Sequence, residues 1–566
     1  MNLKALLNER VAAALAACGA PGDGLVQTAA RPEFGDYQAN GVMAAAKRAG
    51  ANPRELAGRV IEALDLGDIA SSLDIAGPGF INITLAPDFL TRQLANGVGV
   101  ARAETRERVV VDYSAPNLAK EMHVGHLRST IIGDAMVRML EALGHEVIRQ
   151  NHVGDWGTQF GMLLTYMKDE NASAEALADL ETFYRQAKLR FDEDADFADR
   201  ARATVVALQA GEGWARAAWQ QFIDVSMSHC QSVYEALNVT LSPDDVMPES
   251  AYNDALAGVV ERLDGAGLLS ESDGAQCVFL DEFKGKDGSP LPVIVQKSDG
   301  GYLYATTDLA AIDHRSHELT AQRVLYLVDV RQSLHFRQVF AVARAAGFAS
   351  ADIRLEHLAF GAMLGTDGKP FKTREGGVVK LADLLAEARE RARAIVDEKN
   401  PDLSDAEKVA ISQAIGIGAV KYADLSKNRT SDYVFDWEQM LSFDGNTAPY
   451  LQYACARIRS IFRKADQAPE VSGAVTAPAE EPERLLVLSL CRMQEVVEQA
   501  AEDGFPHYLC AYLYEVATRF SQFYEQCNIL NAEGDARERR LNYCAQTLAT
   551  LTLGLSLLGI EAPERM

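Results

Sequence analysis

The sequence predicts a mixed α/β protein with a Rossmann-like core, meaning a parallel, doubly wound sheet covered by helices. Three observations lead to this fold class. Strand, turn, helix and second strand follow one another between Arg108 and Arg149, the spacing of a βαβ unit. The residues before that unit show both helical and strand-like patterns. After Leu381, nearly all apolar residues recur with the period of an α-helix.

We expect three domains. Residues 1–104 form an N-terminal α+β domain with a strand over Gly79–Leu85, and residues 381–566 form an all-helical C-terminal domain. Between them, residues 105–380 carry the parallel sheet and an acidic helical insertion at about 168–275. The predicted helix of this middle domain covers His126–Gly144. Its predicted strands cover Arg108–Tyr113, Glu146–Arg149, Gln276–Leu280, Leu291–Lys297, Tyr302–Thr306, Val324–Val328 and Leu358–Leu364.

Composition and charge narrow the functional class. The 566 residues are 48% apolar and 24% charged, which excludes a disordered, collagenous or disulfide-scaffold protein. The formal net charge of −25 argues against general DNA or membrane-surface binding, because anionic surfaces repel an acidic protein. The acidic excess is concentrated in residues 168–273, whereas residues 411–470 carry 7 acidic and 7 basic side chains. A polyanion can therefore still be bound locally.

The sequence also predicts a cytoplasmic protein without a structural metal. It contains no apolar run long enough for a membrane span, and the alanine-rich start is better described as an amphipathic helix than as a signal peptide. The 8 cysteines form no CxxC pair and no cluster with zinc-ligand spacing. We expect buried free thiols, no bound zinc and no organic cofactor.

His123-Val-Gly125-His126 is the segment most suggestive of chemistry, because it lies where the first core strand passes into its helix. A helix start offers backbone N–H groups and a positive dipole end to an anion, and two imidazoles can add hydrogen bonds to phosphate oxygens. Gly125 leaves room for a purine against the backbone. The alternative is a histidine pair that only packs or caps the helix.

The sequence around this pair resembles the HIGH (His-Ile-Gly-His) signature of the class I aminoacyl-tRNA synthetases. Within that class it resembles the bacterial-type arginyl-tRNA synthetase family. Further segments resemble that family in the same order and cover nearly the whole chain. They are 112–130 (DYSAPNLAKEMHVGHLRST), 152–161 (HVGDWGTQFG), 302–308 (YLYATTD), 361–374 (GAMLGTDGKPFKTR), 444–457 (DGNTAPYLQYACAR) and 557–566 (LLGIEAPERM).

The resemblance implies an arginine–tRNA ligase that forms arginyl-adenylate from arginine and ATP with Mg²⁺, and then charges the 3′ end of tRNA(Arg). It implies that His123 and His126 act on the phosphates. It places Asp112, Asp308 and Tyr304 around the substrate guanidinium, and Asn117 and Gln332 at its α-amino and carboxylate end. The residues alone allow other roles: Asp308 as a helix cap, Gln332 as solvated loop, and Tyr304 as a core residue of a strand.

For tRNA, the resemblance implies D-loop contacts from the N-terminal domain and anticodon contacts from the C-terminal domain. The corresponding residues are Phe80, Asn82, Tyr450, Tyr453, Arg457 and Met566. Phe80 is equally consistent with an ordinary core residue. A solvated basic helix face is the alternative for the region of Arg457, which is followed by further basic residues up to position 464.

One departure from the class concerns the second signature, Lys-Met-Ser-Lys-Ser, which supplies a mobile lysine to ATP. Here Pro370-Phe-Lys372-Thr-Arg374 stands in its place. The candidates for the missing cation are Lys369, Lys372 and Arg374 on the loop and Lys120 before the helix, and we expect Lys120 to replace it with the loop in support. Two rival functions remain at this point: a small-molecule adenylyltransferase that shares the histidine pair, and a non-catalytic tRNA-binding paralogue. We expect a monomer with no DNA or membrane partner.

Overall fold

The computed structural model describes residues 1–171, 179–371, 379–471 and 475–566. The chain divides into two compact units. One contains Met1–Ala101, Ser442–Leu557 and Glu561–Met566, and the other contains Arg102–Leu441 with Leu558–Ile560.

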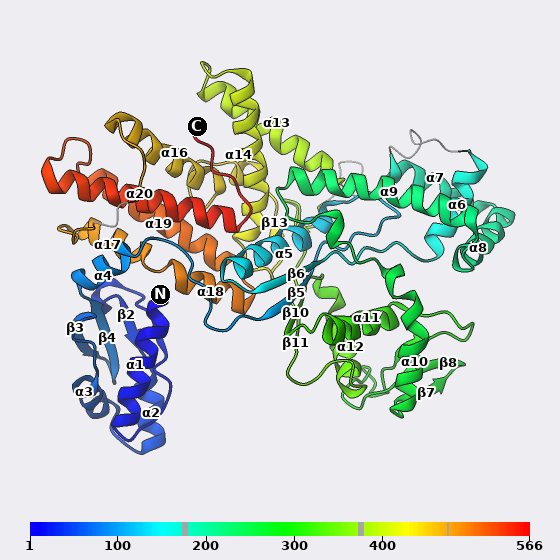
Figure 1. The fold of residues 1–566 in the computed structure, drawn as a ribbon, viewed down its shortest axis with the longest axis horizontal. Helices are drawn as coiled ribbons and strands as arrows, with labels where there is room; N and C mark the ends of the chain where they lie inside the picture. Colours follow the sequence, from blue (N-terminus) through cyan, green and yellow to red (C-terminus); the bar gives the residue numbers. More distant parts are fainter. Residues whose placement is uncertain (172–178, 372–378, 472–474) are drawn as a thin grey trace. The chain divides into compact units, whose positions relative to one another are not determined.

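The second unit is built on a four-stranded parallel sheet in the order β11-β10-β5-β6, which confirms the predicted Rossmann-like core (Figure 1). The strands are β5 (Arg108–Asp112), β6 (Glu146–Gln150), β10 (Arg323–Tyr326) and β11 (Arg354–His357). Tyr326 pairs with Asp112, and Asp112 pairs with Gln150. The last residues of three adjacent strands therefore lie on one rung, at the carboxyl edge where α/β proteins bind ligands.

The first strand and its helix follow directly from their residues. Val109, Val110 and Val111 are fully buried, as expected for a β-branched strand in a parallel sheet with both faces covered. Helix α5 (Val124–Ala142) then packs closely against the strand end. A Cβ at Gly133 would lie 2.4 Å from the Tyr113 ring, so glycine is required for this approach.

The remaining elements of this unit are further helices, among them those within the predicted insertion at about 168–275, and two small sheets. Its helices are α6 (Thr158–Asp169), α7 (Leu180–Glu193), α8 (Ala195–Gln209), α9 (Gly213–Ala236), α10 (Leu256–Gly265), α11 (Tyr304–Asp313), α12 (Ser333–Ala345), α13 (Leu381–Lys399), α14 (Asp405–Leu425) and α15 (Trp437–Met440). The small sheets are formed by β7 (Leu269–Ser272), β8 (Ala275–Val278) and β9 (Val293–Gln296), and by β12 (Met363–Leu364) and β13 (Tyr433–Val434).

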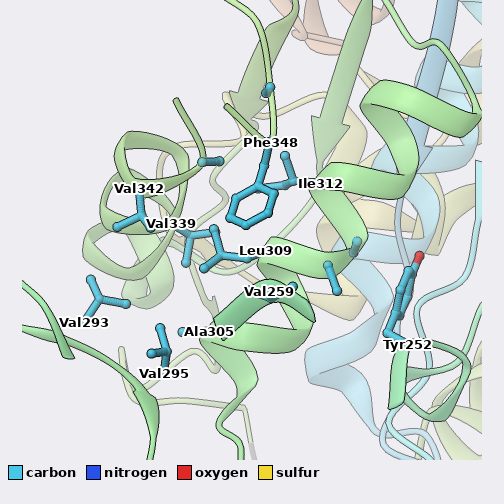
Figure 2. Packing of buried hydrophobic residues seen from close by; sticks show 14 of the residues in the cluster. Tyr252, Val259, Val293, Val295, Ala305, Leu309, Ile312, Val339, Val342 and Phe348 are labelled. Atoms are coloured by element: carbon cyan, nitrogen blue, oxygen red, sulfur yellow. The ribbon is translucent and has the colours of Figure 1, made fainter. Parts of the chain in front are cut away.

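The predicted strand Tyr302–Thr306 is wrong. Strand-like pairing reaches Tyr302, which forms an isolated bridge with Gln296, and the chain turns into α11 at Tyr304. The physical reason is burial at helical spacing: Ala305, Leu309 and Ile312 of α11 enter a cluster with side chains of α10, α12 and β9 (Figure 2). This tertiary packing outweighs the local alternation of apolar and polar residues.

Helices α13 and α14 belong to the same compact unit as the parallel sheet, although the predicted domain boundary separates them from it. A buried ion pair ties α5 to α14: Arg128 Nε lies 3.0 Å from Asp424 Oδ2, and both side chains are almost fully buried. The boundaries at 104 and 380 stay predictions.

The other unit combines an antiparallel sheet with two groups of helices. The sheet has the order β1-β2-β4-β3, from Val26–Thr28, Tyr37–Ala39, Phe80–Leu85 and Ala70–Ala76. The helices are α1 (Leu3–Ala17), α2 (Gly41–Ala49), α3 (Pro53–Ala63), α4 (Pro87–Ala95), α16 (Ala448–Ala465), α17 (Glu481–Leu490), α18 (Met493–Asp503), α19 (His507–Gln526) and α20 (Gly534–Leu557). Among the described residues, no helix is both long and apolar enough to cross a bilayer.

Candidate active site

The two histidines cap α5 with their rings. His123 is the N-cap residue, and its Nδ1 accepts the backbone N–H of Gly125 at 3.0 Å. Nδ1 of His126 accepts the backbone N–H of His123 at 3.1 Å, and the ring centroids lie 4.1 Å apart. A neutral imidazole that accepts through Nδ1 carries its proton on Nε2. The capping role and the phosphate role are therefore compatible, because capping fixes two Nε2–H donors at a helix start.

Electrostatics keep both rings neutral. Burial and the neighbouring His123 together lower the pKa of His126 to about 3, against a raising contribution from the hydrogen bond to the His123 backbone. Burial also lowers the pKa of His123, with a contribution from the nearby Lys120 ammonium. A Cβ at Gly125 would lie 2.7 Å from Cε1 of His123, so this glycine allows the ring to fold over the helix start.

Asp308 and Tyr304 lie on α11, and the structure adds His335 from α12. Nε2 of His335 lies 2.6 Å from Oδ2 of Asp308, and its ring lies 4.7 Å from that of Tyr304. Asp308 is inside the helix, whose N-cap is Leu303, and Tyr304 is 63% exposed. The capping alternative for Asp308 and the core alternative for Tyr304 are therefore wrong.

A second acidic side chain, Glu249, completes this region. Its backbone N–H donates to the Val153 carbonyl at 3.0 Å, which places it beside the chain that follows β6. Burial raises the pKa of Glu249, and the carboxylates of Asp155 and Asp308 raise it further, whereas His152 lowers it. A concentration of partly buried negative charge is suited to a cationic ligand.

The residues expected at the other end of arginine lie on loops at the strand ends. Asn117 is exposed and forms a bridge with Gly154, and its Oδ1 accepts the Ala119 N–H at 3.0 Å. Gln332 is exposed at the start of α12. Asp112, in contrast, is bound by the protein itself: Oδ2 accepts Nη2 of Arg315 at 2.8 Å.

Of the predicted cations, Lys369 is exposed on the described part of the loop, and Lys120 precedes α5. The Lys120 ammonium lies 4.2 Å from the centre of the Tyr184 ring, and its charge acts on His123. Lys372 and Arg374 lie outside the described residues.

The predicted anticodon residues lie on α16. Tyr453 is 45% exposed, whereas the other two contact α19: Tyr450 lies against Tyr514 with centroids 5.6 Å apart, and Arg457 lies 4.1 Å above the Tyr524 ring. Other basic residues of α16 hold the C-terminal segment that ends at Met566. Arg459 donates to the Pro563 carbonyl at 2.9 Å and pairs with Glu564 at 3.2 Å.

The predicted D-loop residues lie on β4. Phe80 is half-buried, and Asn82 is 8% exposed with its Oδ1 accepting Nε2 of Gln38 at 2.7 Å. Asn82 and Gln38 pair across adjacent strands, so they offer amide groups on one face of this sheet.

One group among the described residues has the atoms to hold a metal: Glu480, Glu483 and Cys527. Glu483 is already paired with Arg539 at 3.1 Å and with Arg540 at 2.8 Å. These guanidinium groups neutralise the charge that would attract a cation, so the cluster is an ion-pair network.

Sequence reasoning missed Glu249, His335 and Arg315. Glu249 is one acid among many in the acidic region, and no pattern distinguishes it. His335 follows Gln332 by three residues, one helical turn, which is the only signal that could have connected it with the site. Arg315 lies in a run of charged residues that reads as a solvated helix end.

Three family models match successive parts of the chain. They are tRNA synthetases class I (R), catalytic domain, over residues 90–437; DALR anticodon binding domain, over 451–566; and Arginyl tRNA synthetase N terminal domain, over 2–85.

Curated relatives and solved structures agree with these models. The arginine–tRNA ligases of Cellvibrio japonicus and Laribacter hongkongensis are 56% and 57% identical to this chain, with complete coverage of both sequences. The arginyl-tRNA synthetase structures from Plasmodium falciparum and Thermus thermophilus match all of it, covering 99% and 100% of those chains, with TM-scores of 0.87 and 0.86 at 29% and 27% identity. The chain therefore belongs to the arginyl-tRNA synthetase family of the class I tRNA synthetases.

Proposed function

We propose that the site in the unit with the parallel sheet performs the arginine–tRNA ligase reaction on arginine, ATP and tRNA(Arg). A carboxylate oxygen of arginine attacks the α-phosphate of ATP, forming arginyl-adenylate and releasing pyrophosphate. The terminal ribose hydroxyl of the tRNA then takes the arginyl group, and AMP leaves. The observation that carries this proposal is the half-buried carboxylate of Asp308, whose Oδ2 lies 2.6 Å from Nε2 of His335, in the same unit as Glu249 and the histidine-capped start of α5.

Asp308 and Glu249 bind the substrate guanidinium in this proposal. A carboxylate accepts two parallel N–H bonds from a guanidinium, which the single ammonium of lysine does not match. His335 holds Oδ2 of Asp308 and so orients the carboxylate, and the exposed ring of Tyr304 lies beside the guanidinium plane. Asn117 and Gln332 bind the end of the substrate arginine that carries the α-amino and carboxylate groups.

His123 and His126 donate Nε2–H to the phosphate oxygens, where negative charge develops as the α-phosphate is attacked. Because both rings are neutral, their donor state does not depend on proton uptake near neutral pH. The N-terminus of α5 adds its backbone dipole, and Gly125 gives the His123 ring room to lie over the helix start. ATP enters as its Mg²⁺ complex.

Lys120 replaces the missing lysine on the phosphate side, with Lys372 and Arg374 in support. It precedes His123 by three residues, and its positive charge adds to burial in lowering the pKa of His123. A cation fixed on this side can replace a lysine that the class normally places on the mobile loop.

The tRNA is bound by the other unit. Tyr453 offers an exposed ring for an unstacked base, and Tyr450 and Arg457 lie on the same helix. Met566 ends the segment that Arg459 of this helix holds through the Pro563 carbonyl. Phe80 and Asn82 contact the D-loop of the tRNA. We further propose a monomer that acts in the cytoplasm, where all three substrates are present.

The test of the arginine site is Asp308→Asn, which keeps the shape and removes the charge. We expect the KM for arginine to rise steeply, because a guanidinium loses one charged partner, and the KM for ATP to change much less. Asp313→Asn at the end of α11 is the matched control, since Asp313 pairs with Arg262 outside the site. Equal effects of Asp308→Asn on both substrates would contradict the assignment.

A further inference from the structure

The chain around Glu249 is bound along its backbone to the chain that follows β6. The backbone N–H of Met247 donates to the Asn151 carbonyl at 3.0 Å, and that of Glu249 donates to the Val153 carbonyl at 3.0 Å. The two segments run parallel to each other, as neighbouring strands do in a sheet. Residues 152–161, which resemble the family, thus begin beside one of the two acids proposed to bind the substrate guanidinium.

Asp155, in that segment, holds the residue that follows Glu249. Asp155 is buried, with 1% of its surface exposed. Its Oδ1 accepts the backbone N–H of Ser250 at 3.0 Å, and its Oδ2 accepts the Ser250 hydroxyl at 2.5 Å. The Asp155 carbonyl accepts the Nε1–H of Trp219 on α9 at 2.8 Å. Both carboxylate oxygens are therefore bound to one residue, and the backbone of Asp155 is itself held by a helix.

Stability alone does not account for an acid at this position. Burial raises the pKa of Asp155, and the hydrogen bonds from Ser250 lower it. Asp155 in turn raises the pKa of Glu249, so two like charges lie within electrostatic reach of each other. Taking a carboxylate out of water beside a second carboxylate costs free energy. What the carboxylate provides in return is two acceptors and no donor, which match the N–H and the hydroxyl of Ser250.

We propose that Asp155 is a positioning residue for Glu249: by binding Ser250, it fixes the backbone that carries the Glu249 carboxylate. This inference rests on the proposed arginine site. A guanidinium donates its N–H bonds in one plane and in fixed directions, so two carboxylates bind it well only from fixed positions. His335 orients Asp308. Each acid of the pair thus has a positioning residue of its own.

The experiment measures arginine-dependent ATP–pyrophosphate exchange with tRNA present in Asp155→Ala, Asp155→Asn, Glu249→Gln and the double variant Asp155→Ala/Glu249→Gln. We expect Asp155→Ala to raise the KM for arginine about tenfold, because two hydrogen bonds that place Glu249 are lost, and to leave the KM for ATP unchanged. Asp155→Asn retains an acceptor for the N–H of Ser250, so it raises the arginine KM less. The double variant has the arginine KM of Glu249→Gln, because Asp155 acts through Glu249.

Asp134→Ala is the matched control. Asp134 is fully buried on α5 and binds Thr240 in the same way, since its Oδ1 accepts the Thr240 N–H at 2.7 Å and the Thr240 hydroxyl at 2.6 Å. It lies about three helical turns from His123. We expect Asp134→Ala to lower the melting temperature without changing the arginine KM. If either aspartate variant does not fold, Ser250→Ala and Thr240→Ala repeat the comparison with one hydrogen bond removed, and we expect only Ser250→Ala to raise the arginine KM.

Three results would overturn the proposal. Equal increases in the KM for arginine and for ATP in Asp155→Ala would indicate a general disturbance of the fold. An Asp155→Asn variant as impaired as Asp155→Ala would assign the effect to the charge. An undiminished effect of Asp155→Ala in the Glu249→Gln background would show that Asp155 does not act through Glu249. Failure of the arginine site itself would be seen separately, as an unchanged arginine KM in Glu249→Gln.

Discussion

His126 presents a fixed Nε2–H donor, because its Nδ1 is held by the backbone of His123. Removing one preorganised donor to a developing charge costs about 3–4 kcal/mol, or about 10²–10³ in rate. We expect His126→Ala to slow adenylate formation by this factor and to leave tRNA affinity nearly unchanged. Rapid-quench kinetics and filter binding measure the two effects. His229→Ala on α9 is the control, and a fully active His126→Ala enzyme would contradict the role.

The lowered pKa of His126 gives a second prediction for the same ring. Its folded pKa is about 3 and its ordinary value is 6.5, so between these values the unfolded chain takes up a proton that the native site excludes. Stability contributed by this group is therefore lost as pH falls below 6.5, while the folded ring stays neutral. We expect the NMR signal of the His126 ring to stay constant from about pH 8 to about pH 5. A titration near 6.5 would refute this.

At the scale of structural elements, the proposed function assigns the positive charge on ATP to the start of α5 and to the segment after β12. Lys120 lies 4.2 Å from the centre of the Tyr184 ring, whereas Lys372 lies outside the described residues. We expect Lys120→Ala to lower the turnover of adenylate formation at least as much as Lys372→Ala, without weakening arginine binding, because the charge acts on the phosphates. Exchange kinetics with varied ATP and arginine measure this. A near wild-type Lys120→Ala beside an inactive Lys372→Ala would assign the role to the loop.

The same elements indicate how far a sequence can predict local structure. Strand β5 and helix α5 could be predicted because three consecutive valines and a helical apolar period point to the same answer. The local alternation of apolar and polar residues places Tyr304 in a strand. In the structure Tyr304 begins helix α11, because Leu309 and Ile312 are buried at helical spacing against distant segments. Tertiary packing of this kind leaves no local pattern before the partners are known.

At the scale of the whole molecule, the order of its helical and strand-containing regions could be predicted from the sequence. The ion pairs and hydrogen bonds between charged side chains distant in sequence could not. The helical C-terminal part and the α/β core follow from periodicity, and the ordered segments resembling one family supplied the function. Glu249, His335 and Arg315 could not be found, because each acquires its role from a partner distant in sequence: Asp308 for the first two and Asp112 for the third. Asp112 is an example, since the sequence gives no sign that its Oδ2 accepts a hydrogen bond from the distant Arg315.

The most direct test of the whole account is ATP–pyrophosphate exchange with each proteinogenic amino acid in turn, with and without tRNA(Arg). In the proposed function Asp308 and Glu249 select a guanidinium, and the resemblance to the arginyl family implies that tRNA must be bound before arginine is activated. We expect arginine to be the one amino acid that supports exchange, and to do so only when tRNA(Arg) is present. Exchange supported by another amino acid, or at full rate without tRNA, would contradict it.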